Sequence, residues 1–78
     1  MFTKFLFNGE VQYYATAGNH DQYRIVKRDD GYGYDVIVHK YDAELSAIDG
    51  QVIVEFIGKR LGMFGLLRDA KAHVKSLI

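Results

Sequence analysis

The side chains of this sequence with the most obvious capacity for chemistry are three histidines, His20, His39 and His73. Imidazole is both a common metal ligand and a general base near neutral pH. The histidines fall in a predicted turn, a predicted strand and a predicted helix, so only a particular fold would bring them together. The chain has no cysteine, and no Ser or Thr lies beside a plausible base. We therefore expect no catalytic residue, no metal site and no cofactor, and hence no enzyme.

One short motif, Gly18-Asn19-His20-Asp21, resembles the Gly-Asn-His-Asp box of calcineurin-like metallophosphoesterases. In that family the Asn and His serve a two-metal centre, in which paired cations stabilise the attacking and leaving oxygens. The other metal-binding segments of the family, Asp-x-His, Gly-Asp-x-x-Asp and Gly-His-x-His, do not occur in this sequence. Gly, Asn and Asp are also the residues that a tight turn selects, so we predict a turn here.

A second motif, Gly31-Tyr32-Gly33-Tyr34, resembles the aromatic RNA-binding box of RRM and cold-shock domains. Residues 35–39 resemble the second cold-shock box, and residues 50–56 resemble a later strand of that family, in the same order. The resemblance implies a sheet that stacks bases on its aromatic side chains. The two boxes are directly adjacent here, whereas the family places them on separate strands. Asp30 also stands where the family has a basic residue, so the motif is more simply a glycine-containing turn that leads into a strand.

Turn-forming residues divide the first three quarters of the chain into short segments. Asn8-Gly9 is typical of a type I′ hairpin turn, and residues 18–21 and 29–31 form further turn clusters. The intervening segments are rich in β-branched and aromatic residues, which favour strands. A longer connection, residues 42–50, contains a predicted helical turn around Ala43–Ala47. The predicted strands cover residues 2–7, 10–17, 23–28, 34–41 and 51–57.

The period of the hydrophobic pattern changes from two to 3.6 at Leu66, which predicts a C-terminal amphipathic helix. Short turns between the strands favour an antiparallel meander, and the helix should cover one face of the sheet. A chain of 78 residues is long enough for one domain. The sequence thus predicts a single α+β domain over residues 1–78, an antiparallel meander of four to five strands packed against one C-terminal helix.

Alternation along the predicted strands leaves several large apolar side chains on the face that the helix does not cover. Val52, Val54 and Phe56 are expected under the helix. The opposite set is expected either to form a partner surface, to be covered by the N-terminal hairpin, or to be buried by strong curling of the sheet. The apolar members of that set are Phe5, Phe7, Ile37, Tyr41, Ile53 and Ile57. The residues predicted to bind a partner are Ile37, His39, Tyr41, Ile53 and Ile57.

The formal net charge of zero hides a gradient along the chain. Residues 1–50 carry five Lys and Arg against eight Asp and Glu, whereas residues 51–78 carry five against two. A basic stripe can contact nucleic-acid phosphates, although a solvated helix face has the same pattern. A sequence pI near 6.8 is low for a general nucleic-acid binder. The candidate nucleic-acid-binding residues, as the alternative function, are Lys59, Arg60, Arg68, Lys71 and Lys75.

The segment Leu61–Lys71 resembles the last strand and helix start of many small phage-encoded proteins, which combine a β-meander with a G-x-F-x-x-L-x-x-A-K segment. A related shape occurs in the sheet-reading DNA-binding domains of tyrosine integrases and AP2-type factors. The resemblance covers about a quarter of the chain. It implies a phage origin, with DNA binding as its second implication. Arg24, Lys27, Arg28 and Lys40 are the sheet cations that would have to contact DNA.

The sequence thus predicts a small non-catalytic interaction protein, which binds a protein partner or a second copy of itself. No apolar stretch approaches the roughly 20 residues of a membrane span, and no signal-peptide core is present. We therefore expect no membrane partner and a cytoplasmic location, in the host cytoplasm if the chain is phage-encoded.

Overall fold

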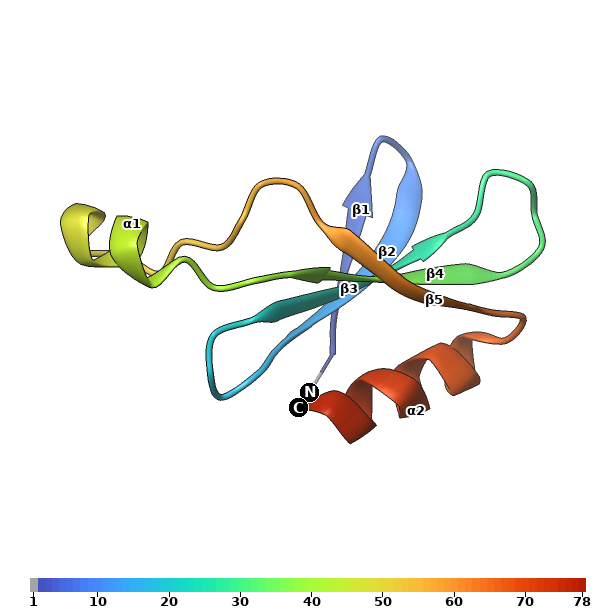
Figure 1. Ribbon diagram of the computed structural model, residues 1–78. Helices are drawn as coiled ribbons and strands as arrows, with labels where there is room; N and C mark the ends of the chain where they lie inside the picture. Colours follow the sequence, from blue (N-terminus) through green and yellow to red (C-terminus); the bar gives the residue numbers. More distant parts are fainter. Residues whose placement is uncertain (1) are drawn as a thin grey trace.

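The computed structural model describes residues 2–78, and it contains one sheet and two helices (Figure 1). The sheet is antiparallel, so the predicted α+β class is confirmed. The elements in chain order are β1 (Thr3–Phe7), β2 (Glu10–Thr16), β3 (Gln22–Lys27), β4 (Tyr34–His39), α1 (Ala43–Asp49), β5 (Lys59–Phe64) and α2 (Leu67–Leu77).

The five strands lie in the sheet in sequence order, β1-β2-β3-β4-β5, and each pairs antiparallel with the next. Short turns join the first four strands, as predicted. Between β1 and β2, Asn8 has φ 50° and Gly9 has φ 80°, the two positive values that a type I′ turn needs. This turn fixes the register in which Phe7 faces Glu10, and all later pairings follow from the same meander.

Helix α2 packs across one face of the sheet and closes the hydrophobic core (Figure 1). We call this side the helix face. Its buried side chains come from four elements, because alternate residues of β2, β3 and β4 point toward the apolar stripe of α2. Val36 and Val74 are fully buried at this contact. The buried core consists of Ala15, Tyr23, Ile25, Val36, Val38, Ala70 and Val74.

Helix α1 lies away from the sheet, at the far end of the connection between β4 and β5 (Figure 1). It forms where the sequence predicts a helical turn. The Asp42 carboxylate accepts a hydrogen bond from the Leu45 amide (3.0 Å), and Gly50 ends the helix in the left-handed conformation. The Ser46 hydroxyl accepts from the Ile53 amide (2.8 Å) and donates to its carbonyl, which ties α1 to the returning chain.

The prediction of a fifth strand at residues 51–57 is wrong, because β5 begins only at Lys59. Residues 51–57 have the stronger β-forming composition, yet most of them lie beyond the end of β4, where no neighbouring strand is available. Their one bridge joins Val54 to Tyr41. The expectation that Val52, Val54 and Phe56 lie under the helix fails with it. Val52 and Phe56 are 59% and 96% exposed, and Val54 is not among the side chains of the core or those packed against it.

A register shift explains how the chain passes from this bridge to β5. From the Tyr41–Val54 bridge to the Val38–Lys59 pair, the returning chain has two more residues than the β4 side. Within β5, a bulge at Leu61 adds one further residue that has no partner on β4. The surplus residues have no partner in the ladder, so the chain leaves the plane of the sheet. We call residues 53–58 the arch; Figure 1 shows it rising above β4 on the side opposite α2.

The contact between α2 and the sheet gives a first prediction. Replacing Val74 with Ala removes buried methyl groups and leaves a cavity against Val36, so we expect a loss of about 2 kcal/mol in the free energy of unfolding. The matched change Leu77→Ala, at a residue 43% exposed, should cost less than about 1 kcal/mol. Urea titration of both variants measures this difference. Equal losses would show that α2 does not close the core through Val74.

Candidate functional site

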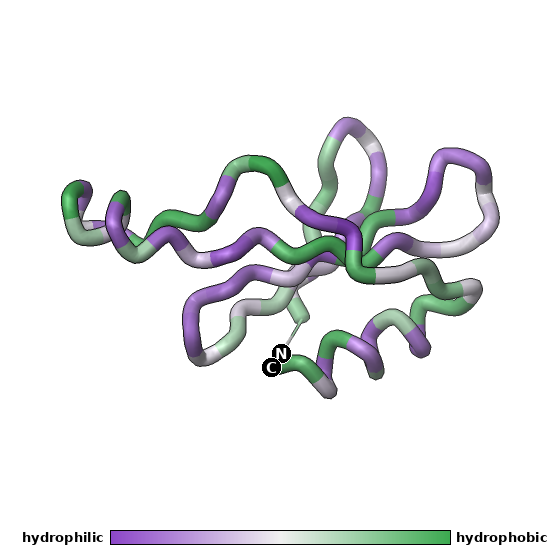
Figure 2. The backbone as a smooth tube through the Cα atoms, viewed as in Figure 1, coloured by the Kyte–Doolittle hydropathy of each residue, from purple (hydrophilic) through white to green (hydrophobic). Residues whose placement is uncertain are grey.

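A groove of about 910 Å³ lies on the sheet face opposite α2, between the arch and β1. We call this side of the sheet the open face. Figure 2 shows hydrophobic residues along the raised part of the connection between α1 and β5, over strands whose residues are of mixed hydropathy. The residues that line the groove are Phe5, Phe7, Gln12, Gln22, Arg24, His39, Ile53, Val54, Glu55, Phe56 and Ile57.

The two walls of the groove are apolar and largely exposed. On the arch, the side chains of Phe56 and Ile57 are 96% and 84% exposed. On β1, Phe7 is 55% exposed, and Phe5 stacks edge-on against Tyr14 with 5.4 Å between the ring centroids. Water therefore contacts apolar side chains on both sides of the same groove, which is unfavourable in the isolated chain.

The floor of the groove is polar, and two of its buried atoms have no hydrogen-bond partner within residues 2–78. These atoms are Oε1 of Gln12 and Nε of Arg24. Gln12 is only 5% exposed. Buried polar groups in folded proteins are nearly always hydrogen-bonded, so two unpaired atoms on one floor distinguish this surface from an ordinary exposed sheet.

The base of the arch is held against β4 by specific contacts. The Glu55 amide donates to the Lys40 carbonyl (2.7 Å), and Nδ1 of His39 lies 2.9 Å from the Glu55 carbonyl. A side chain at Gly58 would meet the Ile37 side chain, and its Cβ would lie 2.8 Å from Cε1 of His39. The absence of a side chain at Gly58 therefore lets the arch return close to β4 before β5 begins.

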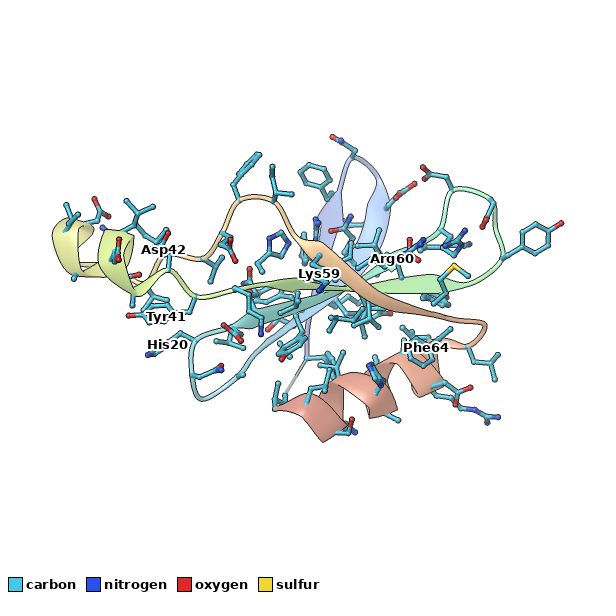
Figure 3. All side chains as sticks on the ribbon, viewed as in Figure 1. His20, Tyr41, Asp42, Lys59, Arg60 and Phe64 are labelled. Carbon is cyan, nitrogen blue, oxygen red and sulfur yellow. The ribbon has the colours of Figure 1, made fainter. Side chains whose placement is uncertain are left out.

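Of the predicted partner-binding residues, His39, Ile53 and Ile57 line this groove, whereas Ile37 and Tyr41 do not, so the five do not form one exposed patch. Ile37 and His39 are half-buried at the base of the arch, and Ile53 is half-buried where the arch begins. Tyr41 is half-buried and packs against His20, with 5.0 Å between ring centroids (Figure 3). Of the five, Ile57 alone is exposed, at 84%. We call Phe56 and Ile57, the two exposed apolar residues of the arch, its crest.

Sequence reasoning did not identify Phe56, Gln12 and Arg24 as parts of this site. Phe56 was assigned to the helix face through the misplaced strand. The strand alternation does place Gln12 and Arg24 on the same face as Phe5, which is the signal that could have found them. Their lack of hydrogen-bond partners is visible only in three dimensions.

The five candidate nucleic-acid-binding residues do not form one surface. Lys59 and Arg60 are neighbours on β5 and so point to opposite faces of the sheet. On α2, Lys71 lies over an aromatic ring, with its Nζ 4.4 Å from the centroid of Tyr13. Arg68 is exposed on the same helix. Lys75 is exposed near the end of α2, so the solvated helix cations are Arg68 and Lys75.

The Gly18–Asp21 motif forms the turn between β2 and β3, and its carboxylate points into the structure. Asp21, 6% exposed, accepts from the Tyr41 amide (2.8 Å), from Asn19 Nδ2 (3.2 Å) and from Lys40 Nζ (3.3 Å). The hydrogen bond from the Tyr41 amide is the main cause that lowers the pKa of Asp21, and Lys40 adds to it. The motif thus joins this turn to the end of β4.

The Gly31–Tyr34 motif does not place its tyrosines on one surface. Tyr32 is 83% exposed in the turn between β3 and β4, whereas Tyr34 packs against the core on the helix face. Arg28 closes this turn by ion pairs to Asp30 (2.7 Å) and Asp35 (2.9 Å), and the Arg28 hydrogen bond lowers the pKa of Asp30. The stacking surface that the cold-shock resemblance implies is not formed by this pair.

Within residues 2–78, no three His, Cys, Asp or Glu side chains gather in a way that could hold a metal ion. The three histidines lie apart, on the turn before β3, on β4 and on α2, where His73 stacks against Phe64. Neither α1 nor α2 is long and apolar enough to cross a membrane. No protein-family model, curated protein or solved structure matches this chain.

The hydrogen bonds to the Asp21 carboxylate give a prediction about pH. Because the pKa of Asp21 is lowered from its ordinary value of 3.8, the ionised carboxylate stabilises the fold above that pH, and this contribution is lost as the pH falls below it. Asp21→Asn should therefore unfold with a weaker pH dependence below about pH 4 than the natural chain. Asp21→Ala, which leaves the Tyr41 amide unpaired, should cost about 1–3 kcal/mol at neutral pH.

Thermal unfolding monitored by circular dichroism between acidic and neutral pH measures both effects. Asp29→Asn, in an exposed turn, is the matched control, since it removes one carboxylate without disturbing these hydrogen bonds. If Asp21→Asn and Asp29→Asn had the same pH dependence, Asp21 would not be the carboxylate that joins the turn to β4.

Proposed function

We propose that this chain is a small non-catalytic binding protein that holds a segment of a partner protein in the groove between the arch and β1. The observation that carries the proposal is that Phe56 and Ile57, exposed on the arch, line the same groove as the phenylalanines of β1. Aromatic and large aliphatic side chains are the usual anchors of protein interfaces.

The shape of the arch supports the same function. Its base is fixed by hydrogen bonds to β4, so its apolar crest is presented by a held segment and not by a free chain end. An interface that is already formed loses less conformational entropy when it binds. Full burial of one such side chain contributes about 1.5–3 kcal/mol, so two on the crest can supply a large part of a micromolar affinity.

Two other partners were predicted from the sequence, and each stays a prediction. A second copy of the chain could occupy the same groove, and light scattering over a concentration series distinguishes this case, because the proposal expects the 8.9 kDa monomer. Binding of nucleic acid through the basic helix would be lost on charge reversal at Arg68 and Lys75. The cytoplasmic location and the absence of catalytic activity likewise stay predictions.

Substitution on the crest of the arch tests the proposed function. We expect the double variant Phe56→Ser, Ile57→Ser to keep the melting temperature of the natural chain, because both side chains are exposed. Peptides selected from a displayed library of random linear sequences against the natural chain should bind this variant at least about tenfold more weakly, since two apolar anchors are lost.

Ile48→Ser is the matched control for this experiment, because Ile48 on α1 is as exposed as Ile57, at 84%, and does not line the groove. It should leave the affinity unchanged. The proposal fails if the selected peptides bind the double variant and the natural chain equally. If instead the natural chain is a dimer that the double variant dissociates, the groove binds a second copy of the chain.

A further inference from the structure

The cations of the open face differ in whether they have an acidic partner. Arg28 pairs with Asp30 and Asp35, and Arg60 lies 3.9 Å from the same Asp35. Arg24 forms no ion pair within residues 2–78, and its Nε is buried without a hydrogen-bond acceptor. A guanidinium group always carries its charge at physiological pH, so its donors favour an acceptor that is itself ionised.

The second unpaired atom in the floor has the opposite requirement. Oε1 of Gln12 is an acceptor, and it lacks a donor within the described residues. Gln12 and Arg24 lie on neighbouring strands, β2 and β3, and both line the groove. Both atoms are buried beneath the surface of the groove, so a ligand in the groove does not reach them. The terminal guanidinium nitrogens of Arg24 are not among the buried atoms, and they are the charged donors that a ligand carboxylate can contact.

The apolar walls of the groove determine which ligand residues can lie on either side of the ligand carboxylate. Phe5 and Phe7 on one side, and Phe56 and Ile57 on the other, offer apolar contacts above a polar floor. The groove contains one acidic residue, Glu55, whose side chain is exposed to water on the arch. Water screens Glu55, while Arg24 below it is partly shielded, so the charge that the floor presents to a ligand is positive.

From this arrangement we infer that the groove selects a peptide segment in which an Asp or Glu side chain is flanked by apolar residues. The carboxylate accepts hydrogen bonds from the terminal guanidinium nitrogens of Arg24, and the apolar side chains contact the two walls. The inference rests on the proposed function and specifies the chemistry of the partner. The geometry also assigns Arg24 as the residue that determines specificity.

Selection of peptides from the same random library, followed by a double-mutant cycle, tests this assignment. We expect the selected peptides to share one acidic position. Changing that position to Asn or Gln, or changing Arg24 to Gln in the protein, should each weaken binding about tenfold or more. The two changes together should weaken it little further, because each removes the same contact. Arg68→Gln, on the far side of the molecule, is the control for the loss of one charge.

The possible outcomes separate this inference from the proposed function. If the selected peptides need Phe56 and Ile57 but carry no shared acidic residue, the binding function stands and the role of Arg24 is refuted. If an acidic residue is shared but Arg24→Gln has no more effect than Arg68→Gln, the role of Arg24 is refuted as well. If no peptide depends on Phe56 and Ile57, both are refuted. Arg24→Lys, which keeps the charge and loses the planar fork, should bind with intermediate affinity and confirms that the fold is intact.

Discussion

Backbone pairing along β4 is the constraint from which the rest of the structure follows. On one side β4 pairs with β3 in continuous register, and on the other it pairs with a returning chain that has surplus residues. The ladder cannot accommodate the surplus, so the arch leaves the sheet between the Tyr41 bridge and Lys59. The contact of Gly58 with Ile37 and His39 brings the chain back. A groove on the open face is the direct consequence.

The two faces of the sheet differ in how far their apolar side chains are shielded from water. On the helix face, Val36 and Val38 pack with the apolar stripe of α2 in the buried core and are shielded from water. The open face has no second helix. The arch lies against His39 at the end of β4, and the part of the open face toward β1 stays exposed. The apolar walls there and the guanidinium of Arg24, for which the described residues supply no ion pair, are the features on which the proposed binding function depends.

Much of the fold could be predicted from local patterns. Asn8-Gly9 predicted the first hairpin, the change of period at Leu66 predicted α2, and strand alternation correctly placed Ile37 on the face that α2 does not cover. The fifth strand could not be predicted in this way, because residues 51–57 have stronger β propensity than the glycine-containing β5. Pairing with β4 decided between them, and pairing is a tertiary property. For the same reason the site was predicted only in part. The predicted residues His39, Ile53 and Ile57 line the groove. The roles of Gln12 and Arg24 could not be predicted, because their lack of hydrogen-bond partners depends on the three-dimensional arrangement of their neighbours.

The arch should be fixed at its base and open at its crest. Nuclear Overhauser spectroscopy of the isolated chain tests this arrangement most directly, because the signal requires protons to be close in space. We expect contacts from Gly58 to Ile37 and His39, and none from Phe56 or Ile57 to Phe5 or Phe7. Strong contacts between the crest and the β1 phenylalanines would contradict it, since the arch would then close the groove and the open face would be part of the core.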